Sequence, residues 1–190
     1  MTLEITTKRL VLRSWRESYL EPFAKLNANP KVMEYFPSVM TKEESGQMVK
    51  KMQAKIDETG YGFLAVSLID TAEFIGFIGL NTIDKSSWPV HFSPAIEIGW
   101  RLAAPYWKKG YATEGALACL TLGFETLNLP EIVSFTAKQN TPSRAVMERI
   151  GMHHDLDGDF DHPKLPDGHR LKKCVLYRLS LTEWEKNNDS

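Results

Sequence analysis

The stretch Trp107-Lys108-Lys109-Gly110-Tyr111-Ala112-Thr113-Glu114 decides how this chain is interpreted. It follows an apolar run at 95–102 that is typical of a buried strand, and it leads into a helical segment from about Thr113 to Leu127. A strand, a glycine turn and a helix start direct free backbone N–H groups toward an anion. By itself, this order of elements predicts only a phosphate-binding turn.

A second segment follows Gly110 at a distance of one helix and one strand. It reads Asn140-Thr141-Pro142-Ser143 and continues as Met147-Glu148-Arg149-Ile150-Gly151-Met152. Together the two segments resemble the coenzyme A site of the GNAT acyltransferases. Gly110 and Ala112 match the end of that family's pattern, Gln or Arg, two residues, Gly, one residue, then Gly or Ala.

Two positions depart from the family pattern. Trp107 stands where Gln or Arg is usual, which is typical of the branch that resembles the ribosomal-protein acetyltransferases RimJ and RimL. Lys108 stands where that branch often has Gly, so the local geometry of the turn is open. The opening Thr7-Lys8-Arg9-Leu10-Val11-Leu12-Arg13 is similar to the first strand of the branch, so the resemblance covers roughly the whole chain.

The resemblance implies the fold and the activity. We expect one α+β domain over residues 1–190, with a central mixed, mostly antiparallel sheet of about seven strands and about four helices. The implied activity is acetyl transfer from acetyl-CoA to a primary amine, with a protein or peptide N-terminal amine as the first choice of acceptor. Two alternatives stay open: a small amine such as an amino acid, polyamine or antibiotic, and a non-catalytic acyl-CoA sensor.

The cofactor's chemistry explains why these residues suit it. Backbone N–H groups at a helix start can hold a pyrophosphate, Gly110 lets the backbone come close, and neighbouring lysines add positive charge. The extended backbone of the apolar run offers partners to the pantetheine amides. By resemblance, Asn140 bonds the pantetheine arm and Ser143 lies beside it. The expected cofactor residues are Ile98, Trp100, Leu102, Trp107, Lys108, Lys109, Gly110, Tyr111, Ala112, Thr113, Asn140 and Ser143.

Two residues are candidates for catalysis. Glu97 interrupts an apolar strand, where a partly desolvated carboxylate is suited to act as a general base, directly or through water. The alternative is a structural glutamate that pairs with an arginine or is exposed. Ser143 is a candidate acid for the leaving thiolate, although its position favours a cofactor contact or a helix cap. Tyr177 is another candidate acid, but its strand position favours the core.

The acceptor site is the least specific part of the prediction. An aromatic loop and an acidic hairpin loop are expected to form its opposite rims, through Trp88, His91, Phe92 and His162. The acidic stretch from Asp155 to His169 has neither the spacing of an EF-hand nor that of a zinc site, so we expect no metal and a solvated hairpin loop from Asp161 to His169.

Composition limits the class of protein. The 190 residues carry a formal charge of −1 with 43% hydrophobic residues, which argues against a broad nucleic-acid-binding surface. No apolar run reaches about 18 residues, and the N-terminus lacks the apolar core of a signal peptide. We therefore expect a cytoplasmic monomer or homodimer without membrane or direct nucleic-acid partners. Cys119 and Cys174 are expected to be buried thiols.

Local patterns predict most of the elements. Ser18 is expected to cap a first helix, and Thr41 with Glu44 forms a capping box for a longer helix that ends at Gly60. Further helices are predicted at 113–127 and 143–150. Strands are predicted at 9–15, 62–68, 74–83, 95–102, 132–136, 153–160 and 170–181.

Overall fold

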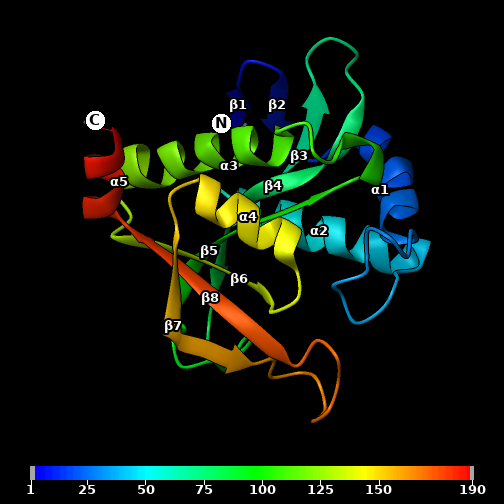
Figure 1. The fold of residues 1–190 in the computed structure, drawn as a ribbon. Helices are drawn as coiled ribbons and strands as arrows, with labels where there is room; N and C mark the ends of the chain where they lie inside the picture. The colour runs from blue at the N-terminus through cyan, green and yellow to red at the C-terminus, as the bar shows by residue number, and fades with distance from the viewer. Residues whose placement is uncertain (1–2, 189–190) are drawn as a thin grey trace. The chain divides into compact units, whose positions relative to one another are not determined.

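The computed structural model describes residues 3–188. Its strands are β1 (Glu4–Thr6), β2 (Leu10–Arg13), β3 (Phe63–Leu68), β4 (Phe74–Ile83), β5 (Ala95–Leu102), β6 (Glu131–Ala137), β7 (His153–Asp161) and β8 (Lys173–Ser180). Its α-helices are α1 (Leu20–Asn27), α2 (Lys42–Thr59), α3 (Tyr111–Thr121), α4 (Thr141–Arg149) and α5 (Leu181–Asn188). Figure 1 labels these elements along the chain.

The strands form a mixed sheet, as the sequence predicts. Within the described residues the sheet has eight strands in the order β1-β2-β3-β4-β5-β6-β8-β7. β5 and β6 run parallel, and the pairs β1–β2, β2–β3, β3–β4, β6–β8 and β7–β8 are antiparallel. The α+β class is therefore confirmed, while the expected counts of about seven strands and four helices omit β1 and α5.

Backbone contacts divide the chain into two compact units. The first contains the residues up to Asn81 together with Gly99–Cys119, and the second contains Thr82–Ile98 together with the residues from Leu120 onward. The first unit therefore carries the glycine turn, and the second carries the Asn140 segment.

Aromatic packing organises the core of the first unit. The Phe23 ring is central: its centroid lies 4.8 Å from that of Trp15 and 6.1 Å from that of Phe77. Phe74 joins the same group directly, with its centroid 6.2 Å from that of Phe23, and it stacks on Tyr19 at 5.2 Å. Burying rings of this size supplies much of the hydrophobic free energy of a small unit.

Helix α2 begins and ends as the sequence predicts. Thr41 Oγ1 accepts the Glu44 N–H at 3.1 Å, and the Glu44 carboxylate accepts the Thr41 N–H at 2.7 Å, so both halves of the capping box form. Gly60 ends the helix in a left-handed conformation with φ of 80°. The buried apolar side chains of α2 are Val49, Met52 and Ile56, which recur at helical spacing.

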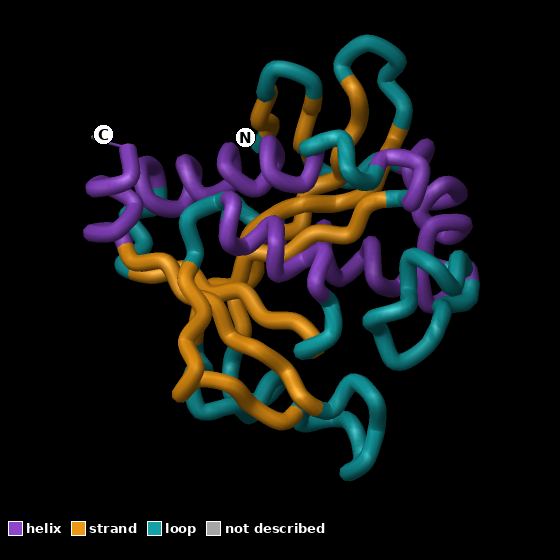
Figure 2. Tube along the Cα trace, in the orientation of Figure 1, coloured by secondary structure: helices purple, strands orange, loops and turns teal. Residues whose placement is uncertain are grey.

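The second unit has a core of its own. Ile83, Val133 and Leu176 are buried together, and half-buried aromatic side chains pack on them. Strands β7 and β8 pair at both ends but not between Asp155 and Phe160, where the register shifts. Figure 2 shows the two strands side by side, joined by a long loop. This loop is the hairpin connection that the sequence predicts after Asp161.

Some predicted boundaries are wrong by a few residues. Ser18 does not cap α1, because the backbone enters through the short 3-10 turn Glu17–Tyr19 and neither helix start has a side-chain cap. Helix α3 begins at Tyr111 rather than near Thr113, since the Gly110 carbonyl already accepts the Glu114 N–H. Helix α4 begins at Thr141 rather than at Ser143. Across residues 3–188, the helices all fall short of the length and apolarity that crossing a bilayer requires.

We predict that Thr41→Ala lowers the free energy of unfolding by about 1 kcal/mol, because it removes the side-chain cap from α2. Urea titration of the purified protein measures the change. Ser18→Ala is the matched control and should change stability by less than about 0.5 kcal/mol, since Ser18 makes no cap bond. Equal losses in the two variants would contradict this capping assignment.

Candidate functional site: a clamped turn and a capped helix

The turn between β5 and α3 contains two residues in the left-handed region. Lys108 has φ of 60° and Gly110 has φ of 82°. Glycine adopts this conformation freely, but for lysine it costs roughly 1–2 kcal/mol. The branch's usual glycine at this position thus has a physical reason, and the lysine keeps the same turn under strain.

The turn ends where the first helical hydrogen bond forms. The Glu114 N–H donates to the Gly110 carbonyl at 3.0 Å. The N–H groups of Tyr111, Ala112 and Thr113 belong to the first turn of α3, whose N–H groups have no partner within the helix. They carry the positive end of the helix dipole, and Lys108 and Lys109 lie beside them in the chain.

Arg9, the residue before β2, holds this turn in place. Its Nε donates to Glu114 Oε2 at 2.6 Å, and its Nη1 donates to the Lys109 carbonyl at 2.9 Å. The guanidinium also lies 4.5 Å from the centre of the Tyr111 ring. The backbone N–H of Arg9 and the Thr7 hydroxyl both donate to Glu114 Oε1. We call this set, Thr7, Arg9 and Glu114, the turn clamp.

The end of β5 is fixed by the first residue of the motif. The Trp107 indole N–H donates to the Leu102 carbonyl at 2.7 Å, and the Lys31 ammonium lies 5.8 Å from the centre of the indole ring. Ile98 and Leu102 are buried, whereas Trp100 is partly exposed. Ile98 and Leu102 can therefore offer a ligand only their backbone, which is the contribution the sequence predicts for the strand.

The second motif forms the start of α4. Asn140 is buried, and its Oδ1 accepts the Ser143 N–H at 3.3 Å, so Asn140 rather than Ser143 is the helix cap. Its Nδ2 donates to Thr136 Oγ1 at 2.8 Å and to Ser143 Oγ at 3.1 Å. The structure thus brings Asn140 and Ser143 into direct contact.

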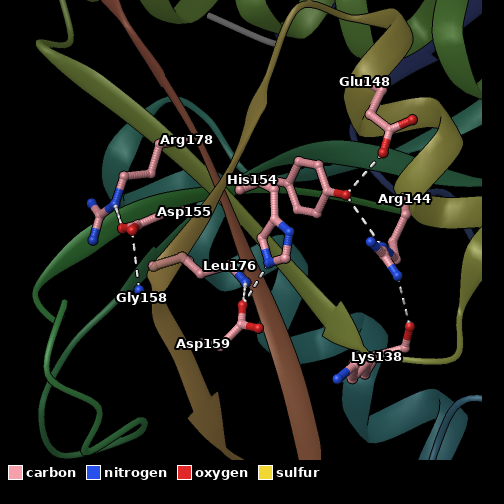
Figure 3. A network of polar contacts seen from close by, with 10 residues as sticks. Lys138, Arg144, Glu148, His154, Asp155, Gly158, Asp159, Leu176 and Arg178 are labelled. Atoms are coloured by element: carbon pink, nitrogen blue, oxygen red, sulfur yellow. Dashed lines mark hydrogen bonds and ion pairs between the residues drawn. The ribbon is translucent and has the colours of Figure 1, made fainter.

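Helix α4 is anchored through one tyrosine of β8. Tyr177 is 1% exposed, and its hydroxyl donates to Glu148 Oε1 at 2.9 Å and accepts from Arg144 Nε at 3.2 Å. Arg144 Nη1 also donates to the Lys138 carbonyl, two residues before Asn140, as Figure 3 shows. Burial raises the pKa of Tyr177, with Glu148 raising it further and Arg144 opposing. The tyrosine is therefore a core residue, as its strand position predicts.

With this geometry in view, comparison with known proteins identifies the family. The model of the acetyltransferase (GNAT) domain matches residues 9–153. The chain belongs to the GNAT family. It is therefore an N-acetyltransferase of GNAT type, a family whose members use acetyl-CoA.

Relatives of known sequence match this GNAT chain over nearly its whole length. It is 30% identical to an uncharacterized N-acetyltransferase, YnaD, of Bacillus subtilis, over 96% of this chain and 99% of that protein. It is also 30% identical to the FsC-acetyl coenzyme A-N(2)-transacetylase of Aspergillus fumigatus, over 94% of this chain and 76% of that protein.

Solved structures match the fold as well. An acetyltransferase of the GNAT family from Bacillus anthracis is 28% identical with a TM-score of 0.77, over 95% of this chain and 99% of that one. RimL, a ribosomal L7/L12 alpha-N-protein acetyltransferase in complex with coenzyme A, is 19% identical with a TM-score of 0.74, over 94% and 98% of the two chains. The second likeness shows a shared fold.

The GNAT strand β5 places the candidate base Glu97 next to β6. Glu97 is half-buried and pairs in parallel register with Val133. The neighbouring Ile98 carbonyl accepts the Ser134 hydroxyl at 2.9 Å, which fixes this part of the strand. Its role as a base stays a prediction.

The two loops expected to bind the acceptor lie against each other. The Trp88 and His162 rings meet edge to face with centroids 4.9 Å apart, and Phe92 packs on Phe135 at 5.9 Å. His91 is exposed, and its ring meets that of Phe92 edge to face with 5.2 Å between the ring centres. The loops are therefore one continuous surface and not opposite rims, because the loop between β4 and β5 contacts the loop between β7 and β8 through the Trp88 and His162 rings.

Ion pairs and backbone bonds account for the acidic stretch. Asp155 accepts from Arg178 and from the Gly158 N–H, and Asp159 accepts from His154 and from the Leu176 N–H. These contacts replace ladder bonds where β7 and β8 do not pair (Figure 3). Among residues 3–188, no group of three His, Cys, Asp or Glu side chains is arranged to hold a metal ion.

Sequence patterns missed the residues that position the site. Arg9 and Glu114 are 105 positions apart, and Arg144 and Tyr177 are 33 apart. Glu114 belongs to the first motif and Glu148 to the second, and each is an acid in a helix that binds a group on a distant strand. An acidic residue inside each motif was thus the one feature of the sequence that could have indicated these positioning contacts.

We predict that Glu114→Gln destabilises the protein at pH 7 and that the loss shrinks on acidification. Desolvation raises the pKa of Glu114, but its bonds to Thr7 and Arg9 outweigh that effect and lower the pKa below 4.5. A carboxylate whose pKa is lower in the folded than in the unfolded protein stabilises the folded state at pH values above its unfolded-state pKa. This stabilisation is lost as the pH falls through the folded-state pKa. Urea unfolding at pH 7, 5 and 3.5 measures the difference.

The control for this prediction is Glu43→Gln, at an exposed glutamate in the first turn of α2. Its stability difference from the wild type should stay nearly constant over the same pH range. A constant difference for Glu114→Gln as well would mean that the turn clamp does not depend on the carboxylate's charge.

Proposed function

We propose that this GNAT enzyme transfers the acetyl group of acetyl-CoA to the α-amino group of a protein or peptide N-terminus. The observation that carries the proposal is the clamped turn, in which Lys108 and Gly110 are both left-handed ahead of the first turn of α3. Such a turn is costly for the lysine, and the clamp maintains it.

The turn fits the pyrophosphate of coenzyme A. The N–H groups of Tyr111, Ala112 and Thr113 supply donors at the positive end of a helix dipole. A Cβ on Gly110 would approach Arg9 Nη2 to 3.3 Å and would be strained at this φ, so the position favours glycine. Lys108 and Lys109 are exposed and add positive charge for the phosphates.

We assign the pantetheine arm to Asn140 and Ser143 by resemblance. The cap bond uses one lone pair of Asn140 Oδ1, which leaves a second for a ligand amide. Arg144 and Tyr177 hold the start of α4 and are positioning residues in this proposal. Acetyl-CoA supplies a thioester carbonyl that a neutral amine can attack.

The cysteines favour direct transfer to the amine over an acyl-enzyme. Burial raises the pKa of Cys119 to about 12 and that of Cys174 to about 11. A thiol with such a pKa is almost never a thiolate at pH 7, so neither cysteine is a suitable nucleophile. Glu97 and water are left to accept the amine's proton.

An α-amino acceptor needs the least help with deprotonation from such a site. A group with a pKa near 7.7–8.0 is about one-tenth neutral at pH 7, whereas a lysine amine with a pKa of about 10.4 is neutral roughly once in 2,500. The surface formed by Trp88, Phe92 and His162 is proposed to contact the first residues of the acceptor, with His91 at its exposed edge. Burial lowers the pKa of His162, which favours the neutral form of this ring.

Acetylation of a small amine is the second candidate. It is favoured by the 30% identity to a relative whose name gives an N(2)-transacetylase activity on FsC. Both candidates use the same donor and the same turn. They differ only in the acceptor.

An amine panel with acetyl-CoA tests the proposal through release of free coenzyme A thiol. Peptides with free N-termini should be acetylated at least about tenfold faster than N-terminally blocked lysine peptides or free polyamines and amino acids. Faster turnover of the small amines would favour the second candidate. Binding of coenzyme A without any thiol release would favour a sensor.

Gly110→Val tests the turn without an acceptor. The variant should weaken coenzyme A binding by at least about tenfold in calorimetry, because the side chain crowds Arg9 and opposes the left-handed backbone. Gly168→Val is the matched control, since Gly168 has φ of 78° and open space around it. Equal affinities in the two variants would remove the turn from the binding site.

Glu97→Gln tests the base. It should slow acetylation of a peptide by about 10²-fold at pH 7 and by less than tenfold at pH 9, where the α-amine is already mostly neutral. Initial rates at saturating acetyl-CoA measure both values. The same slowing at both pH values would show that Glu97 does not act as a base.

A further inference from the structure

Arg101 on β5 is a buried cation that neither motif explains. It is 7% exposed, and burial lowers the pKa of its guanidinium to about 10. The cause of this lowered pKa is the loss of water around the buried charge. Burying an arginine in this way is expensive unless a partner is supplied.

Its contacts inside the first unit are neutral. Nη1 donates to Asn27 Oδ1 at 2.6 Å, and Asn27 is held in turn by a bond from its Nδ2 to Ser45 Oγ. The Phe36 ring lies over the guanidinium at 4.0 Å, and Phe77 lies at 5.4 Å. No ion pair of residues 3–188 includes Arg101, and its buried Nε has no hydrogen-bond partner.

The side chains that cover Arg101 are only half-buried. Phe36, Met40 and Met48 belong to the connection after α1 and to the start of α2, and both methionine sulfurs lie 3.9 Å from Nη1. The two methionines also line a surface hollow of about 450 Å³, together with Glu43, Glu44, Gln47 and Lys51. Methionine side chains adapt readily, so this cover can move without disturbing the backbone.

We propose that Arg101 is a binding subsite for a carboxylate of the acceptor, reached from this hollow when Met40 and Met48 move aside. One N–H of Nη1 is used by Asn27, and the other side of Nη1 meets only the two methionine sulfurs, which are weak acceptors. A carboxylate that replaces these sulfurs is a stronger, charge-assisted acceptor for the guanidinium, whose Nε also has no hydrogen-bond partner. The inference rests on the proposed function, because it specifies the acceptor of the same reaction.

Charges around the hollow do not oppose a carboxylate strongly. Glu43 and Glu44 are exposed at its mouth, and the Glu44 carboxylate is already held by the Thr41 N–H. Exposed charges are screened by water and salt, whereas a desolvated guanidinium attracts an anion at much shorter range and lower dielectric. Lys51 adds a positive charge on the same lining.

The test compares matched tripeptides that end in a free carboxylate or a carboxamide, and matched peptides that begin with Asp or Asn. In at least one pair, the wild type should acetylate the peptide with the carboxylate with a kcat/KM about tenfold to a hundredfold higher than that for the matching amide. This is the range that one charge-assisted hydrogen bond supplies. Arg101→Met should bring that ratio close to one. Arg101→Lys keeps the charge without the planar edge and should retain an intermediate ratio.

Arg13→Met is the matched control. Arg13 also has a buried Nε without a partner, but it lies 3.5 Å from Glu4 in an ion pair. This variant should leave the acid-to-amide ratio unchanged. Arg101→Met should keep its unfolding midpoint within about 5 °C of the wild type, because replacing a buried charge by an apolar side chain is often neutral. If the Arg101→Met variant does not fold, the subsite is tested with Arg101→Lys and with the NMR resonance of the Arg101 Nε–H in the wild type.

The Nε–H resonance separates failure of this inference from failure of the proposed function. In ¹⁵N spectra it should shift on titration with the acid member of a pair and not with its amide. Acetylation with equal rates for acid and amide in every pair, and no shift, would overturn the subsite and leave the function standing. Coenzyme A binding without acetylation of any amine, with the shift present, would overturn the function and leave an anion site.

Discussion

The bonds that Arg9 makes to Glu114 and to the Lys109 carbonyl are the constraint on which the turn depends. One guanidinium binds the middle of the turn and the first turn of α3, so the two cannot separate. The Lys108 backbone, left-handed and strained, persists because this clamp holds the residues on its C-terminal side. A turn held before a ligand arrives loses little conformational entropy when the ligand binds, which favours affinity.

The fold was predictable wherever its cause is local. The capping box at Thr41, the glycine that ends α2 and the strands β4 and β5 follow from residues within a few positions of one another. Ser18 has the right residue type for a cap, but the chain enters α1 through a 3-10 turn that the sequence does not signal. Strand β1 has three residues, too few for a period, and is stabilised by pairing with β2.

The candidate site was predictable only in its motifs. Gly110 and Asn140 are recognisable because the backbone geometry around them restricts the residue type. Arg9 and Tyr177 are not, since each acts through a side chain that meets its partner by tertiary folding. The contact between Trp88 and His162 is of the same kind: it joins the loop between β4 and β5 to the loop between β7 and β8, and no local pattern contains it.

Lys108 and Arg101 share a property that separates them from the rest of the first unit. One is a lysine in a conformation that suits glycine, and the other is a buried cation without a carboxylate. Neither gains a compensating contact among the described ion pairs, although natural sequences are otherwise locally consistent with their fold. Such exceptions concentrate at functional sites. In this GNAT chain one exception lies in the turn proposed for the phosphates, and the other is therefore expected to bind a ligand as well.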